Sequence, residues 1–204
     1  MKILLHICCA NCAVYPAGSL RSEGHQLAGF WFNPNIHPYQ EYRSRLDSLK
    51  KMGDKWRLDI IYSGGYDPAE FFEMLETADS LNGPITSRES VTPSPERCGS
   101  CYSLRLEKTA EQASLRGFDA FTTTLLISPF QNFEQINETG RELADKYNVS
   151  FYLRDFRPYF RESMAAAKEL GIYRQKYCGC IYSMEERQRK KPENAAAAKK
   201  KRSG

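Results

Sequence analysis

The chain has 204 residues, of which 41% are hydrophobic and 26% are charged, proportions typical of a folded globular domain. Its net charge is +4, but eight of its 29 basic residues and one of its 25 acidic residues lie in residues 187–204, so residues 1–186 carry a net charge of −3. No apolar run has the length of a membrane span, and His6 interrupts the short run that would otherwise resemble a signal peptide. We therefore expect a cytoplasmic protein that does not contact membranes.

Short apolar runs that alternate with helical patterns predict the fold class. The runs that fit buried β-strands are residues 2–8, 27–32, 58–62, 118–126 and 149–153. Between them, apolar residues recur at helical spacing and predict helices that begin near Ala13, Tyr42, Asp67, Cys101 and Phe133, with a last helix over 158–170. This alternation indicates an α/β fold with a parallel sheet of about five strands.

Glycine, proline and charge set the expected boundaries. Gly24 and Gly53 are expected to end the first two helices, and residues 79–97, which hold three prolines, predict a long loop. Residues 1–192 are expected to form one domain. Residues 193–204 have too little apolar bulk to pack, so we expect a disordered basic tail. Such a tail either attracts nucleic acid without sequence preference or is simply solvated.

All seven cysteines lie in three clusters, namely Cys8, Cys9 and Cys12, then Cys98 and Cys101, then Cys178 and Cys180. Structural cysteines behave as small apolar residues and would be scattered through the core. Thiols spaced one to three residues apart are typical of metal ligands. An iron–sulfur or other thiolate-bound metal centre is the favoured interpretation, with zinc and redox disulfides as the alternatives.

The seven cysteines can be divided into a set of four and a set of three, which suits two metal sites. Adjacent Cys8 and Cys9 suit a cluster with several metal corners better than one tetrahedral zinc, and the Cys98–Cys101 pair completes four thiolates. Three further thiolates would leave an open position on a second metal, and these belong to Cys12, Cys178 and Cys180. Other divisions of seven cysteines are possible. The first cluster follows a predicted strand, at the sheet edge where parallel sheets bind ligands.

One short motif suggests a different chemistry. Residues 63–67 read S-G-G-Y-D, which matches the phosphate loop of ATP pyrophosphatases. That loop normally follows the first strand, whereas this one follows the third, and Pro68 replaces the usual serine or threonine. An ordinary strand-to-helix turn is therefore the favoured interpretation.

Five motif blocks together carry a family resemblance. They are H-I-C-C-A-N-C from His6, F-N-P-N-I-H-P-Y-Q-E-Y-R from Phe32, R-C-G-S-C-Y-S-L-R-L from Arg97, T-T-T-L-L-I-S-P-F-Q from Thr122 and Y-R-Q-K-Y-C-G-C-I-Y-S from Tyr173. Over roughly residues 1–190 the chain resembles the QueH family of cobalamin-independent epoxyqueuosine reductases. The resemblance implies a HUP-like three-layer α/β domain. It also implies reduction of epoxyqueuosine to queuosine at the wobble position of tRNAs with G-U-N anticodons, the last step of queuosine biosynthesis.

The same resemblance implies the cofactors. The family binds a [4Fe–4S] cluster at positions that match Cys8, Cys9, Cys98 and Cys101. An adjacent mononuclear iron is bound at positions that match Cys12, Cys178 and Cys180, and these three residues would form the catalytic metal site. The family can carry aspartate at the position of Cys12, so a cysteine there offers the second metal a softer ligand. An electron donor, which the sequence does not identify, is also required.

Aromatic and basic side chains usually recognise unpaired bases in RNA. The expected nucleoside-binding residues precede the last cysteines and are Tyr173, Arg174, Gln175 and Tyr177. A second polar patch at a predicted strand end comprises Asn33, Asn35, His37, Glu41 and Arg45. For both sets the alternative is a structural turn or a solvated face. Proton donors near cysteines are Tyr177, Tyr182 and His6, although His6 fits a packed strand position better.

Two other functions remain open from the sequence. An ATP-dependent sulfurtransferase that thiolates tRNA would use the S-G-G-Y-D turn and cysteine persulfides. A zinc-stabilised RNA-binding module would use the same cysteines without catalysis. ATP binding distinguishes the first from a reductase, and visible absorbance distinguishes the second, because zinc proteins are colourless.

Overall fold

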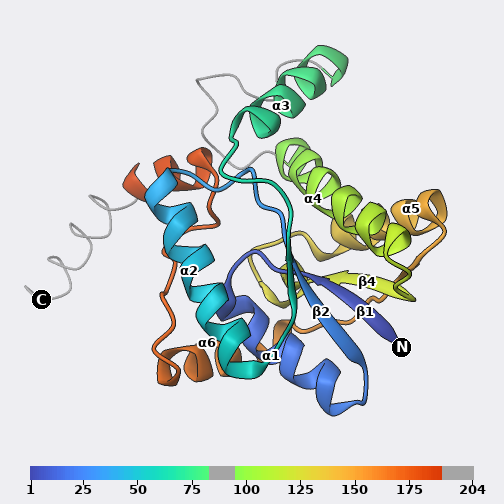
Figure 1. Ribbon diagram of the computed structural model, residues 1–204. Coiled ribbons are helices and arrows are strands. Elements are labelled where there is room, and N and C mark those ends of the chain that lie inside the picture. The colour runs from blue at the N-terminus through green and yellow to red at the C-terminus, as the bar shows by residue number, and fades with distance from the viewer. Residues whose placement is uncertain (83–94, 190–204) are drawn as a thin grey trace, which may run out of the picture.

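A five-stranded parallel sheet forms the centre of the computed structural model, which describes residues 1–82 and 95–189 (Figure 1). The strand order is β3-β2-β1-β4-β5. The strands are β1 Lys2–His6, β2 Gln26–Trp31, β3 Ile60–Tyr62, β4 Ala120–Thr123 and β5 Ser150–Phe151. In the middle of the sheet, Leu5 pairs with Gly29 of β2 on one side and with Thr122 of β4 on the other.

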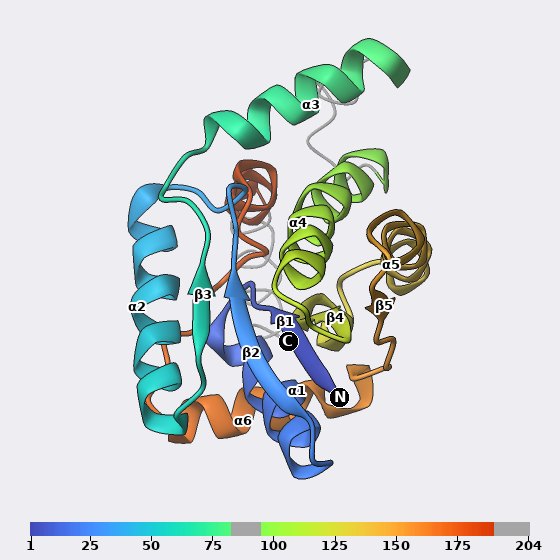
Figure 2. The same ribbon diagram turned by 45° about the vertical axis from the view of Figure 1, so that its right-hand side comes forward.

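Helices cover both faces of this sheet (Figure 2). One face carries α1 Ala10–Ser22, α2 Tyr39–Trp56 and α6 Phe160–Glu169, and the opposite face carries α4 Pro95–Leu115 and α5 Phe133–Tyr147. Successive residues of β1 point to opposite faces, so Leu4 packs in the core beneath α4 and α5, while Leu5 packs beneath α2 and α6. Both leucines have no exposed surface, as expected for a central parallel strand.

Shorter elements complete the chain. Helix α3 Ala69–Asn82 extends beyond the sheet and contacts α4 (Figure 1). Two 3-10 helices, η1 Thr124–Ile127 and η2 Arg157–Tyr159, follow β4 and precede α6. Residues 181–189 form a last helical segment after the third cysteine cluster.

The predicted fold class is confirmed, because all five strands are parallel and helices form the two outer layers. Several predicted boundaries are wrong. The fourth strand ends at Thr123, since the next four residues form η1. Helix α2 passes Gly53 and ends at Trp56, where Arg57 adopts a left-handed conformation.

The predicted loop over 79–97 is wrong at both of its ends. Helix α3 continues to Asn82, and α4 already begins at Pro95, rather than at Cys101. A proline is tolerated in the first turn of a helix because the missing N–H has no partner there anyway. The rest of that loop and the predicted tail, 193–204, lie outside the described residues. No helix in the described part of the chain is long and apolar enough to cross a membrane.

Candidate metal centre

The first cysteine cluster follows the carboxyl end of β1. Cys8 and Cys9 lie in the turn after the strand, and Cys12 lies in the first turn of α1. Between β1 and β4 the connections change from one face of the sheet to the other, so this edge is the topological switch point. Thr124 at the start of η1 contacts the cluster, since its Oγ1 accepts the N–H of Cys8 at 3.1 Å and donates to Cys8 Sγ at 3.3 Å. The fold thus places these thiols where open parallel sheets bind ligands.

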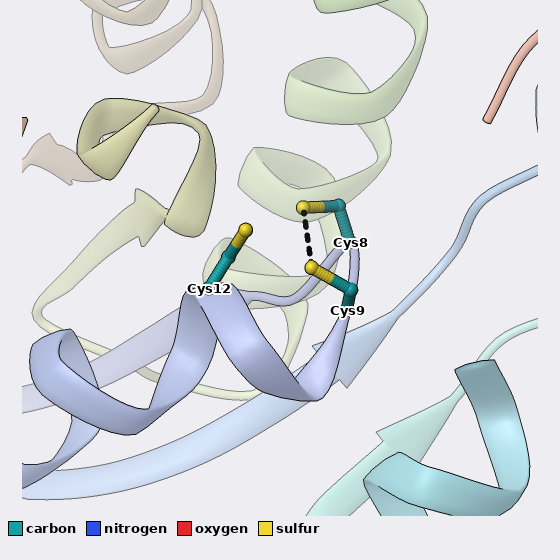
Figure 3. A group of neighbouring side chains, drawn as sticks. All are labelled: Cys8, Cys9 and Cys12. Carbon is teal, nitrogen blue, oxygen red and sulfur yellow. Dashed lines mark hydrogen bonds between the residues drawn. The ribbon is translucent and has the colours of Figure 1, made fainter. Parts of the chain in front are cut away.

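The sulfur atoms of this cluster face one another (Figure 3). The Sγ atoms of Cys8 and Cys9 are 3.8 Å apart, and all three sulfur atoms lie within 4.8 Å of one another. Hydrogen bonds from the thiols of Cys12 and Cys9 hold the pKa of Cys8 well below its usual range, although burial opposes this. Burial raises the pKa of Cys9, and the hydrogen bond to Cys8 raises that of Cys12. Of the three thiols, Cys8 therefore ionises most readily, and the thiolate is the form of cysteine that binds metals.

The second cluster lies on α4. Cys98 and Cys101 are three residues apart in the helix and therefore lie on the same side of it. Cys101 is buried against Phe71 of α3 and Cys180 of the third cluster. Burial, with smaller contributions from the neighbouring Cys180 and Cys98, raises the pKa of Cys101 to about 11, although the charge of Arg105 opposes the shift. The second and third clusters thus lie side by side, although 77 or more residues separate them in sequence.

The third cluster lies in a tight turn that packs against the loop before α2. Gly179 has φ 129°, a value that side chains strongly disfavour, and a Cβ there would approach Arg45 Nη1 at 3.1 Å. Its carbonyl oxygen accepts the N–H of His37 at 2.8 Å. The hydroxyl of Tyr177 donates to the carbonyl oxygen of the same histidine. The glycine between Cys178 and Cys180 is therefore required by both conformation and space.

A buried ion pair in α2 is hydrogen-bonded to the backbone of this turn. Arg45 Nε donates to Glu41 Oε1 at 2.8 Å within α2, and both side chains are buried. The other two nitrogens of Arg45 donate to the carbonyl oxygens of Cys178 and Tyr177, each at 2.9 Å. Tyr173 completes the network, because its hydroxyl donates to Glu41 Oε2 at 2.6 Å. Polar residues of α2 thus position the segment that carries the last two cysteines.

The donor set suits a thiolate-bound metal. All seven cysteines are free thiols, so no disulfide uses them. The neighbouring polar groups donate hydrogen bonds to sulfur: Gln175 Nε2 lies 2.8 Å from Cys9 Sγ, and Gln131 Nε2 lies 3.7 Å from Cys178 Sγ. Such donors stabilise thiolate ligands and are common around iron–sulfur centres.

Comparison with known proteins decides the family. Residues 3–186 match the family described as "Epoxyqueuosine reductase QueH". The chain belongs to the QueH family. It is 34% identical to the epoxyqueuosine reductase QueH of Dehalococcoides mccartyi, over 91% of this chain and 94% of the relative. It is also 34% identical to the QueH protein of Thermotoga maritima, over 94% of both chains.

A solved structure supports the fold assignment. A predicted subunit of tRNA methyltransferase from Methanocaldococcus jannaschii superposes with a TM-score of 0.50 at 14% identity. The match covers 82% of this chain and 75% of the other. At this identity the similarity concerns the fold alone.

In this QueH-family chain, the four residues predicted to bind the nucleoside do not share one environment. Tyr173 and Tyr177 contact the α2 network, and Arg174 is exposed. Gln175 lies against sulfur instead, with its Oε1 accepting from Asn11 Nδ2 at 2.8 Å and its Nε2 3.7 Å from Cys12 Sγ. The predicted segment is thus close to the cysteines, and one of its members contacts them directly.

His6 is a packed strand residue, as its sequence context indicated. It has no exposed surface, and both ring nitrogens have partners, Thr123 Oγ1 at 2.9 Å and the carbonyl oxygen of Phe32 at 3.2 Å. Burial, and to a lesser degree the charge of Arg105, lowers its pKa to about 4. His6 is therefore neutral near pH 7 and is a poor proton donor.

The S-G-G-Y-D motif lies at the edge of the sheet, after β3. Its polar groups form hydrogen bonds within the protein. The carbonyl oxygen of Gly65 accepts from Tyr42 Oη at 3.2 Å, Tyr66 Oη lies 3.0 Å from His37 Nδ1, and Asp67 Oδ1 accepts the N–H of Ala69 at 3.0 Å. These contacts describe a strand-to-helix turn that begins α3.

Among the residues of this centre that the sequence interpretation missed is Arg105. It is buried in α4, one turn after Cys101. Burial lowers the pKa of its guanidinium, but negative charge at Cys101, Cys178 and Cys8 outweighs this and raises the pKa. An arginine one helical turn after the second cysteine of C-x-x-C was the available signal, but only the tertiary structure shows that its side chain is buried.

Proposed function

We propose that this protein is an epoxyqueuosine reductase that converts epoxyqueuosine to queuosine in tRNA. Membership of the QueH family over nearly the whole chain carries the proposal. Two observations support it: the first cysteine cluster lies at the switch point of the sheet, and Cys101 of the second cluster packs with Cys180 of the third. The substrate is the wobble nucleoside of tRNAs with G-U-N anticodons. Reduction of the epoxide to an alkene consumes two electrons and two protons and releases one water molecule.

The proposed ligands follow the family pattern. Cys8, Cys9, Cys98 and Cys101 would hold a [4Fe–4S] cluster, while Cys12, Cys178 and Cys180 would hold a second metal, proposed to be iron. When bound, the cluster supplies electrons one at a time and the second metal acts as a Lewis acid toward the epoxide oxygen. The exposure of Cys178, in contrast to the burial of Cys9 and Cys101, supports placing the substrate on the side of the third cluster.

The protein's own residues orient these ligands and hold the substrate. Arg45 fixes the backbone of the third cluster, and Gln175 donates to the sulfur of Cys9. Tyr173, which is 38% exposed, and the exposed Arg174 would contact the nucleoside and its phosphates. Burial raises the pKa of Tyr177 to about 12, with Glu41 adding to the effect, so its phenol keeps its proton at neutral pH. Tyr177 and Tyr182 are the proposed proton donors, and the electron donor is a separate reductant.

An anaerobic turnover assay tests the function. Metal-replete protein, a strong chemical reductant and epoxyqueuosine-bearing tRNA are combined without cobalamin or ATP, and digested nucleosides are analysed by mass spectrometry. The expected product is lighter than the substrate by one oxygen atom. Persistence of the epoxide with fully loaded enzyme would refute the proposal. A requirement for ATP would favour a sulfurtransferase, and a colourless zinc-loaded protein that binds tRNA without turnover would favour the RNA-binding module.

A further inference from the structure

Arg105 places a positive charge inside the protein beside the cysteines. Its side chain is 1% exposed, and its Nε donates to the carbonyl oxygen of Cys101 at 3.1 Å, one helical turn earlier. Its Nη2 is also buried but has no hydrogen-bond partner among the residues that the structure describes. A buried guanidinium with an unused donor is costly, so its charge must be balanced by a group that the protein holds nearby.

The other buried arginines show how this chain normally balances such a charge. Arg45 pairs with Glu41 at 2.8 Å, and Arg97 lies 3.8 Å from Glu186. Among the residues that the structure describes, no carboxylate lies within 4.0 Å of the Arg105 nitrogens. The hydrogen bond to the backbone of Cys101 instead places the guanidinium beside the second cluster, and negative charge at Cys101, Cys178 and Cys8 raises the pKa of Arg105.

The helix explains this position. Cys98, Cys101 and Arg105 are three and four residues apart in α4, so they lie along one stripe of its surface. The part of that stripe formed by Cys101 and Arg105 faces the interior rather than solvent, because both residues are buried, and Cys101 packs with Cys180 of the third cluster. The same turn geometry that presents two thiols therefore presents the cation beside them.

We propose that Arg105 is the counter-charge of the thiolate-bound cluster, that its free Nη2 donates to a cluster sulfur, and that it thereby sets the reduction potential. This inference rests on the cluster proposed above. A nearby positive charge stabilises the reduced cluster more than the oxidised one, because the reduced form is more negative. Arg105 is thus a positioning and tuning residue, and it keeps the cluster reducible by a weaker electron donor.

The test measures the midpoint potential of the cluster by an electron paramagnetic resonance titration of the whole protein. The variants are Arg105→Gln, which removes the charge, and Arg105→Lys, which keeps it. The matched control is Arg116→Gln, which removes an equal charge from the exposed end of the same helix region. At a fixed ambient potential, the reduced-to-oxidised ratio should fall at least tenfold in Arg105→Gln, which equals about 59 mV for one electron. Arg105→Lys and Arg116→Gln should stay close to the wild type.

Each alternative result has a definite meaning. An unchanged potential in a cluster-loaded Arg105→Gln protein would overturn the inference while leaving the proposed function intact. If Arg105→Gln folds but takes up no cluster, the Arg105→Lys variant distinguishes the explanations. A cluster-loaded Arg105→Lys protein with a potential near that of the wild type would support the need for a positive charge. Loss of the cluster from both variants would overturn the inference. A wild-type protein without an iron–sulfur signal after anaerobic reconstitution would refute the proposed cofactor as well.

Discussion

Arg45 and Cys178 are 133 residues apart in sequence, yet Arg45 Nη1 donates to the carbonyl oxygen of Cys178 at 2.9 Å. This single bond links the middle of α2 to the turn that carries the last two cysteines. Because the guanidinium also binds Glu41, a buried ion pair fixes the backbone from which two proposed metal ligands project. The proposed second metal site therefore depends on a residue that is not among its proposed ligands.

Replacing Arg45 by methionine should loosen the third cluster and destabilise the protein. The change leaves the carboxylate of Glu41 buried without its partner, which typically costs about 3–5 kcal/mol. Thermal unfolding should show the loss, and metal analysis should show less of the second metal than of the cluster iron. The double variant Arg45→Met with Glu41→Gln should recover part of the stability. An Arg45→Met protein as stable as the wild type would contradict this account.

Replacing Gln175 by leucine should speed the loss of the cluster. Its amide donates to Cys9 Sγ at 2.8 Å, and hydrogen bonds to charged acceptors contribute about 1.5–3 kcal/mol. We expect cluster release to a chelator to become about tenfold faster or more, followed by visible absorbance. Arg174→Ala is the control, since this exposed neighbour should leave cluster release unchanged while weakening tRNA binding. Equal release rates for wild type and Gln175→Leu would exclude a role at sulfur.

The division of the cysteines can be tested with two variants. Cys98→Ser should weaken or empty the [4Fe–4S] cluster, because it removes one of four proposed thiolates. Cys180→Ala should keep the brown colour and the cluster sulfide but lose turnover, because the second metal is lost. Iron and sulfide analysis checks both. Full iron and sulfide in Cys98→Ser, or a colourless Cys180→Ala protein, would show that the ligands are divided differently.

Gly140→Ala should destabilise the protein without touching the metal centre. Gly140 lies in α5 directly beneath Phe151 of β5, and an added Cβ would overlap the aromatic ring. Overpacking of this kind costs about 1–3 kcal/mol. Denaturant unfolding measures the change, with Gly18→Ala in α1 as control, since a Cβ there meets nothing within 4 Å. Equal destabilisation of the two variants would argue against the Phe151 contact.

Removal of the basic tail, residues 193–204, should weaken tRNA binding mainly at low salt. The four lysine and arginine side chains of this segment can bind phosphates through counterion release, which added salt suppresses. Binding is compared over a salt series for the full chain and the shortened one, and turnover with saturating tRNA should not change. An identical salt dependence for both proteins would leave the tail without a role in binding.

The fold class and the number of strands followed from the sequence because they depend on local patterns. Apolar runs such as residues 2–8 are long enough to be recognised as strands without further information. Their alternation with helical patterns is typical of a parallel sheet covered by helices. The start of α4 was missed for a local reason as well. Pro95 resembles a loop residue until one sees that it occupies the first turn of a helix.

The sequence by itself determined which chemical groups are available to bind a metal. Seven thiols at short spacings are a property of the chain and can be recognised without knowing the fold. The tertiary structure decided which residues support them. The contacts of Arg45 with the Cys178 turn and of Gln175 with Cys9 join segments that are 133 and 166 residues apart, and the burial of Arg105 beside Cys101 likewise depends on tertiary packing. No local periodicity encodes such contacts, because they arise only when the sheet order brings the ends of β1 and β4 together beside α4.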